Sequence, residues 1–105
     1  MAKQYKPDFT TIFGRQYGKL TDDDKALADT AIKNLTAYVN AEDRKSEEME
    51  RIGQDLRVKV ITRFKKQRPR RMEATFAYDG RIVWALDGDL LRFIYIGPHS
   101  VLDKK

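Results

Sequence analysis

The chain contains no cysteine and only one histidine. Without cysteine it can form neither a disulfide framework nor a thiolate zinc site, and a single histidine excludes a metal site built from several histidines of one chain. No apolar run is long enough to cross a bilayer, and residues 1–4 lack the apolar segment of a secretory signal. We therefore expect a cytoplasmic protein that needs no metal or other cofactor.

Charge is plentiful but unevenly placed. Residues 1–53 hold nine Lys or Arg against ten Asp or Glu, whereas residues 54–105 hold twelve against six. Eight basic residues fall in one stretch without an intervening acid: Arg57, Lys59, Arg63, Lys65, Lys66, Arg68, Arg70 and Arg71. Such a tract must face anions or solvent, and a polyphosphate is its commonest biological partner. The alternatives are a solvated loop or a contact for an acidic protein.

The N-terminal half is expected to be mainly helical. Residues 5–9 are typical of a short strand, and Pro7 within it suits the edge of a sheet. Apolar residues at helical spacing predict a first helix over 9–20. Thr21, followed by three aspartates, marks the start of a second helix that runs to about Asn40. Its expected buried stripe consists of Leu27, Ala31, Leu35 and Tyr38 or Val39.

The C-terminal half is expected to form a sheet. Residues 41–53 either continue the second helix or form a linker that ends at Gly53. Alternating apolar and polar residues then predict strands over 55–62, 72–78, 81–86 and 90–96. The last of these is apolar except for Arg92 and should be central.

Together these elements predict one domain over residues 1–105, at a length that suits a two-layer core. The expected fold is α+β, an N-terminal helical hairpin packed on one face of a small, mainly antiparallel sheet. The other face should be open to a partner and should carry Lys59, Arg81 and His99.

The only histidine, His99, follows the last expected strand, and a histidine beside a cationic tract suits chemistry on a phosphate backbone. Cleaving RNA without a metal requires that the ribose 2′-OH lose its proton, that the added negative charge be stabilised, and that the leaving 5′-oxygen gain a proton. Imidazole suits either proton transfer, and arginine can grip two phosphate oxygens. With no second histidine, a lysine, a carboxylate or the surroundings of the substrate must handle the other proton.

The last third of the chain also carries a resemblance. The Tyr78-Asp79-Gly80 turn, the strand that begins Arg81-Ile-Val, the Gly88-Asp89 turn and the ending Ile96-Gly-Pro-His-x-x-Leu-Asp103 follow one another in order. This series resembles the C-terminal half of the RelE/ParE toxin superfamily, on its RelE side. The resemblance implies a toxin of a type II toxin–antitoxin module. Such a toxin enters the ribosomal A site and cleaves mRNA through attack by the 2′-OH of the RNA, and its partner is a cognate antitoxin.

The resemblance also implies roles for particular residues. His99 is expected to be a general acid or base, and Arg81 to grip the scissile phosphate. Basic residues are expected to contact RNA or the ribosome: Lys59, Lys65, Lys66, Arg68 and Arg70. Two features depart from the family pattern, because Gly80 replaces the usual aromatic before the arginine and the basic linker is long.

Other interpretations of the same residues remain open. His99 can be an exposed loop residue, and Arg81 can bind a strand-end carbonyl or pair with Asp79. The alternative functions are a ParE-like toxin that inhibits DNA gyrase and a non-catalytic module that binds nucleic acid or protein. An enzyme needs His99 and Arg81, whereas a gyrase inhibitor does not.

Overall fold

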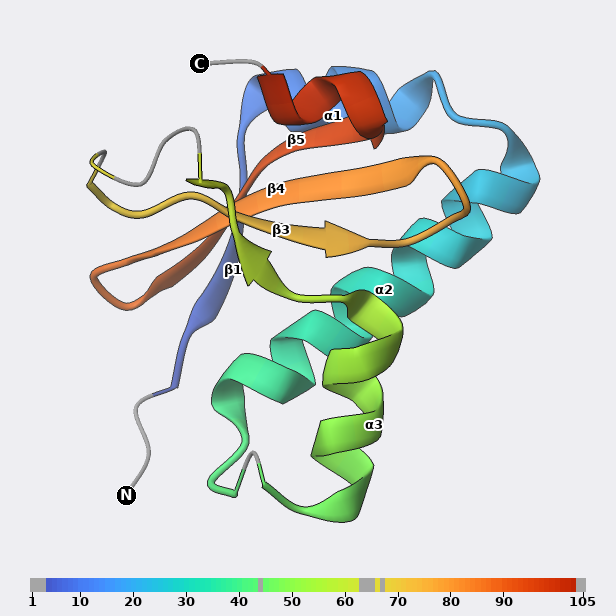
Figure 1. Cartoon of the computed structure of the whole chain (residues 1–105). Helices are drawn as coiled ribbons and strands as arrows, with labels where there is room; N and C mark the ends of the chain where they lie inside the picture. Colours follow the sequence, from blue (N-terminus) through green and yellow to red (C-terminus); the bar gives the residue numbers. More distant parts are fainter. Residues whose placement is uncertain (1–3, 44, 63–65, 67, 104–105) are drawn as a thin grey trace.

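In the computed structural model, residues 4–43, 45–62, 66 and 68–103 are described. Five strands form one sheet in the order β1-β5-β4-β3-β2 (Figure 1). The strands are β1 (Lys6–Phe9), β2 (Lys59–Val60), β3 (Met72–Thr75), β4 (Gly80–Asp87) and β5 (Leu90–Pro98). The helices are α1 (Thr11–Gly18), α2 (Asp22–Asn40), α3 (Glu47–Leu56) and a final 3-10 helix, η2 (His99–Asp103). The predicted α+β class with a mainly antiparallel sheet is confirmed.

Strand β1 lies at an edge of the sheet, as predicted. It runs parallel to β5, whereas β2, β3, β4 and β5 pair antiparallel. The backbone N–H groups of Lys6 and Thr10 donate to the carbonyls of Asp89 and Phe93. Pro7 has no N–H and occupies a position between these two donors, so the edge strand loses no ladder bond to it.

The helices cover one face of the sheet and enclose the larger core. Helix α1 packs mainly on β5, and α2 packs against α3. The most deeply buried side chains of this core include Phe13, Leu35, Leu56, Ile82, Trp84 and Phe93. Contacts of Tyr17 join the first two helices: its hydroxyl donates to the Asp29 carboxylate at 2.7 Å, and Lys25 Nζ lies 5.9 Å from the centre of its ring.

Helix α2 begins where the sequence predicts. The Asp24 N–H donates to the Thr21 hydroxyl at 3.1 Å, which is the expected cap. The predicted buried stripe is right for Ala31, Leu35 and Val39 but wrong for Leu27, which is 49% exposed. Ala28 takes its place, because the buried positions of this helix recur at intervals of three and four residues from 28 onward.

The expectation for residues 41–62 was partly wrong. A separate helix, α3, starts after the cap residue Ser46 and ends at Arg57, whose φ of 49° is left-handed. Gly53 lies inside this helix rather than at its end. The predicted strand over 55–62 shrinks to Lys59–Val60, because Leu56 is buried in the helix-side core and prolongs the helix.

The opposite face of the sheet is covered in part, which corrects the expectation of a fully open face. Helix η2 folds back over it and buries its own Val101 and Leu102 side chains. The resulting small cluster consists of Ile61, Val83, Tyr95, Val101 and Leu102. No helix in the described part of the chain has the length and apolar character needed to cross a membrane.

An irregularity in β5 decides which side chains reach each face. Val83 pairs with Tyr95 and Trp84 with Phe93, so the ladder skips Ile94. The extra residue is a β-bulge. It lets Phe93 face the helices while Tyr95, two residues later, faces the other side.

Candidate functional site

The start of β4 and the end of β5 lie side by side, and this brings Arg81 and His99 to the same end of the sheet. Arg81 pairs with Gly97, and Gly80 pairs with Pro98, the residue before His99. Helix η2, which begins with His99, contacts both β4 and β5. The ladder therefore brings two residues that are 18 positions apart in the sequence to the same end of the sheet.

The Arg81 side chain is half-buried against the turn that precedes it. Its Nη1 donates to the carbonyls of Gly80 at 3.0 Å and Tyr78 at 3.3 Å, with a longer contact to Ala77. Arg81 therefore does bind carbonyls at the end of its strand, as one of the alternative interpretations predicted. All of its side-chain hydrogen bonds to described residues come from Nη1, which leaves Nε and Nη2 for a ligand.

His99 is exposed at the first position of η2, and its ring has no hydrogen bond to a described residue. The residues on either side of it, Pro98 and Ser100, line a hollow of about 260 Å³ between β5 and the end of α1. Lys19, Leu20 and Ile96 line the same hollow. Ile96 belongs to the helix-side core, and His99 itself is not one of the lining residues.

A buried acid lies on the same face of the sheet. Glu73 is 7% exposed and is the one buried charged residue in the described ranges. It pairs with Val83 in β4, two residues from Arg81, so both side chains project from the same face. Lys59 is mostly exposed and approaches the Glu73 carboxylate at 3.7 Å. The alternation of Glu73 with Met72 and Ala74 is the one sequence signal for its position in a strand, and no sequence pattern predicts its burial.

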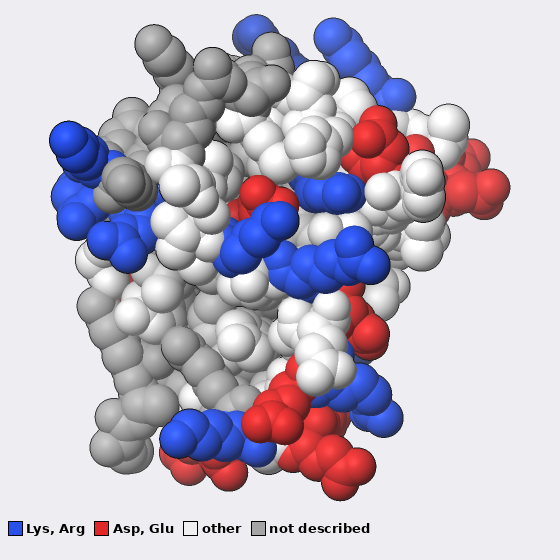
Figure 2. All heavy atoms as spheres, in the orientation of Figure 1, with Lys and Arg blue, Asp and Glu red and all other residues white. Residues whose placement is uncertain are grey.

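Arg71 is a second residue that the sequence analysis did not select. Its guanidinium lies 5.6 Å from the centre of the Tyr95 ring, within the range of a cation–π contact. In the view of Figure 2, Lys and Arg side chains cross the middle and left of the molecule, whereas acidic side chains lie mainly at the right and bottom. A basic side chain stacked on an aromatic ring beside a buried acid gives this face both charge and a flat surface.

The predicted RNA contacts divide between the two sides of the sheet. Lys59 lies on the face with Glu73 and Arg81, and Lys66 and Arg68 are exposed in the connection between β2 and β3. Lys65 lies outside the described residues. Arg70 is not brought together with them, because it lines a hollow with Trp84 on the helix side.

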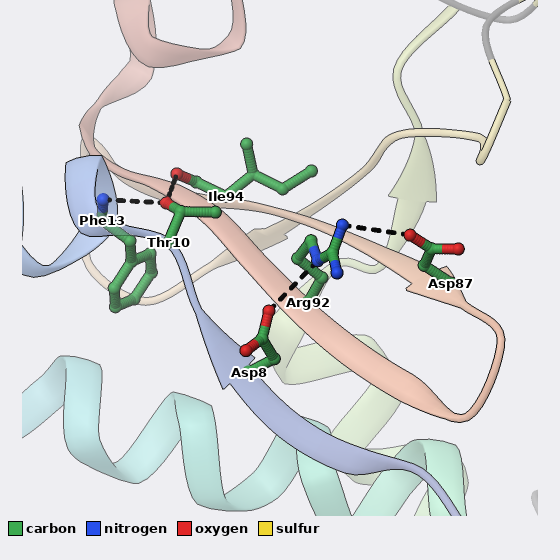
Figure 3. A network of polar contacts seen from close by, with 6 residues as sticks. All are labelled: Asp8, Thr10, Phe13, Asp87, Arg92 and Ile94. Carbon is green, nitrogen blue, oxygen red and sulfur yellow. Dashed lines mark hydrogen bonds and ion pairs between the residues drawn. The ribbon is translucent and has the colours of Figure 1, made fainter.

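On this face of the sheet, Arg92 already forms ion pairs with two acidic side chains. Arg92 Nε lies 3.1 Å from the Asp8 carboxylate, and its Nη1 lies 3.0 Å from that of Asp87 (Figure 3). The three residues come from β5, β1 and β4, so this network ties three strands together. Arg92 is therefore held as a structural cation at the end of the sheet away from His99. In the described ranges, no three His, Asp or Glu side chains are grouped as metal ligands.

No protein-family model and no curated protein matches the sequence. Solved structures do share the fold. A chain of the E. coli DinJ–YafQ toxin–antitoxin complex has a TM-score of 0.69 at 13% identity, covering 96% of this chain and 99% of that one. A copper-bound mutant toxin from Helicobacter pylori has a TM-score of 0.64 at 20% identity, with coverage of 93% and 98%. YafQ from E. coli has a TM-score of 0.59 at 14% identity, with coverage of 96% and 100%.

Proposed function

We propose that this chain, which shares its fold with solved toxins, is the toxin of a type II toxin–antitoxin module. Its activity would be ribosome-dependent cleavage of mRNA, and its protein partner a cognate antitoxin. The shared fold extends over nearly the whole chain, and one of the similar structures is a toxin–antitoxin complex. The observation that carries the proposal is the pairing of Arg81 with Gly97, which sets an arginine beside the strand end that leads to the only histidine.

In the proposed reaction the RNA supplies its own nucleophile. The 2′-oxygen attacks the adjacent phosphorus, a P–O bond forms, and the bond to the leaving 5′-oxygen breaks. The free Nε and Nη2 of Arg81 would neutralise the charge that accumulates on the phosphate oxygens. The His99 imidazole would transfer a proton at one of the two reacting oxygens.

The second proton transfer requires a second group, and we assign this role to Glu73. Among the described residues it is the one buried carboxylate, and it lies on the face that carries Arg81. Lys59 approaches this carboxylate at 3.7 Å, and a carboxylate oxygen can accept a proton from the 2′-OH. The exposed Lys59, Lys66 and Arg68 would hold the phosphate backbone along this side. Their contribution should weaken as salt concentration rises.

The proposal is tested by primer extension on a reporter mRNA in a translating extract. Wild type should give discrete cuts that require ribosomes, and His99→Ala should lower their yield by about 100-fold or more. The control is Gln54→Ala, which alters an exposed residue of α3 outside the candidate site and should cut as wild type does.

Each other outcome has a definite meaning. Cuts that persist in His99→Ala would show that the protein is a nuclease but that His99 takes no part in the reaction. The absence of any cut by wild type, with translation intact, would refute the proposal. That outcome would leave the second candidate, a gyrase inhibitor or a binding module, and a supercoiling assay would then separate these two.

A further inference from the structure

The two sides of β5 are covered over different lengths. On one side β4 pairs with β5 as far as Pro98. On the other side β1 pairs only with residues 90–93 and then ends. Among the described residues, β1 and β4 are the two neighbouring strands of β5. The backbone groups that β5 presents beyond residue 93 on the β1 side therefore need partners other than a strand.

Two side chains at the start of the chain supply these partners. Thr10, the N-cap residue of α1, donates its hydroxyl to the Ile94 carbonyl at 2.7 Å. Gln16, within α1, accepts the Ile96 N–H with its Oε1 at 2.9 Å. Helix α1 packs on β5 (Figure 1). Its side chains thus continue, beside the end of β5, the hydrogen bonding that β1 provides further back.

The bond from Gln16 cannot be replaced by water in the folded protein. Ile96 is 1% exposed and belongs to the helix-side core, so its N–H is shielded from solvent. A buried N–H that loses its acceptor is destabilising, because the group has given up its hydrogen bond to water. Without Gln16, the end of β5 would have to move to bring this N–H to a new acceptor.

This bond lies next to the candidate site. The ladder pair that follows Ile96 is the pair of Gly97 with Arg81. Two residues separate Ile96 from His99, and the second of them, Pro98, has a restricted φ. A movement at Ile96 would therefore displace the His99 imidazole relative to the Arg81 guanidinium.

We propose that Gln16 is a positioning residue for His99. Its side-chain carbonyl holds the edge of β5 that no strand covers, and so fixes the place where the imidazole leaves the sheet. This inference rests on the proposed nuclease function, because His99 has a chemical role only in that reaction. A misplacement of about 1 Å can lower a reaction rate by about 100-fold, so a residue that does not touch the RNA can control cleavage.

The first test compares two variants of Gln16. Gln16→Met keeps the length of the side chain and removes the acceptor. In a translating extract, its maximal rate of mRNA cleavage per folded molecule should fall by about tenfold or more, at an unchanged protein concentration for half-maximal rate. Gln16→Glu keeps an oxygen at the same position and should restore most of the rate. Equal losses in the two variants would contradict the role of the acceptor.

A general loss of stability is controlled by Thr21→Val. This variant also loses one hydrogen bond to a backbone N–H, that of Asp24 at 3.1 Å, at the start of α2. It should cleave as wild type does per folded molecule, and a loss as large as that of Gln16→Met would overturn the proposal. Gln16→Asn keeps the amide but shortens the side chain by one carbon. It should behave as Gln16→Met does, and it decides the question where Gln16→Met does not fold.

A second readout needs no activity. His99 is the only histidine, so its imidazole Cε1–H gives a single NMR resonance. Gln16→Met should shift this resonance, and Thr21→Val should leave it in place. An unshifted resonance in folded Gln16→Met would overturn the inference even where wild type cuts mRNA. If wild type does not cut, the proposed function fails by itself, and a shifted resonance would still show that Gln16 positions His99.

Discussion

Arg81 stands directly across the β4–β5 ladder from Gly97, a residue without a side chain. A Cβ added at Gly97 would lie 3.9 Å from the Val101 side chain of η2, and the Arg81 guanidinium is anchored through Nη1 to the turn carbonyls. An anchored guanidinium with two free nitrogens is preorganised to receive an anion, because little side-chain entropy remains to be lost.

Replacing Arg81 should separate catalysis from folding. We expect Arg81→Ala to lower mRNA cleavage by about 100-fold, as removal of a charge-stabilising donor does. The free energy of unfolding should fall by only about 1 kcal/mol, since the Tyr78 carbonyl is exposed and the Gly80 carbonyl still accepts the Phe76 N–H. Primer extension and urea denaturation measure the two effects, with Arg51→Ala on α3 as the control. A loss of cleavage no larger than the loss of folded protein would assign Arg81 a purely structural role.

The buried carboxylate gives a second prediction. Glu73→Gln keeps the shape of the side chain and removes its charge, so cleavage should fall by about 100-fold if the carboxylate accepts a proton. Stability should change by less than about 1 kcal/mol from the lost ion pair, because Lys59 is mostly exposed. Glu48→Gln, on the exposed side of α3, is the matched control for cleavage. Full activity of Glu73→Gln would remove this residue from the reaction.

Thr10 joins two parts of the chain, and its removal should cost more than that of an ordinary cap. Its hydroxyl accepts the Phe13 N–H at 3.0 Å and donates to the Ile94 carbonyl at 2.7 Å (Figure 3). We expect Thr10→Val to lower the free energy of unfolding by about 2 kcal/mol, and Thr21→Val, which loses a cap alone, by about 1 kcal/mol. Urea denaturation measures both. Equal losses would show that the bond to Ile94 adds nothing.

Two glycines make a matched pair for stability. A Cβ at Gly80 would lie 2.6 Å from the Phe76 ring, so Gly80→Ala should destabilise the fold by about 1–3 kcal/mol. A Cβ at Gly14, within α1, would meet nothing within 4 Å, and Gly14→Ala should stabilise by up to about 1 kcal/mol. Thermal denaturation of the two variants checks the opposite signs. A neutral Gly80→Ala would mean that the Phe76 ring can move aside freely.

Tyr17 predicts a pH effect at alkaline pH. Its hydrogen bond to the Asp29 carboxylate raises the pKa of the phenol above that of an ordinary tyrosine. The folded state thus holds this proton more tightly than the unfolded state, and the stabilisation is complete below the unfolded pKa. It is lost as pH rises through the folded pKa. In Asp29→Asn the pKa of Tyr17 should fall, which NMR titration measures. An unchanged pKa would exclude Asp29 as its cause.

The parts of the fold that depend on neighbouring residues were predictable. Thr21 and its aspartates act within one helical turn, and the alternation in β4 acts within one strand, so the sequence shows both directly. Other features depend on distant partners. The bulge at Ile94 lies beside a hydrogen bond from Thr10, which is 84 residues away, and no local pattern signals it.

The candidate site also combines residues that a local sequence pattern predicts with features that depend on distant partners. His99 and Arg81 were identified from short motifs, and the ladder places them at one end of the sheet. The opposite orientation of Arg70 and the burial of Glu73 follow from strand register, which the basic tract does not encode. A run of positive charge predicted a partner of negative charge, but the run itself could not show that the sheet divides its members between two faces.

The pairing of β1 with β5 has a consequence for synthesis of the protein. Residues 6–9 emerge from the ribosome long before residues 90–93, which are their partners in the sheet. Strand β1 therefore cannot pair with β5 until nearly all of the described chain has been translated. The end of β5 that positions His99 appears later still. A nascent chain thus has no assembled site, and a protein proposed to cut messages on ribosomes would be harmless to the ribosome that is making it.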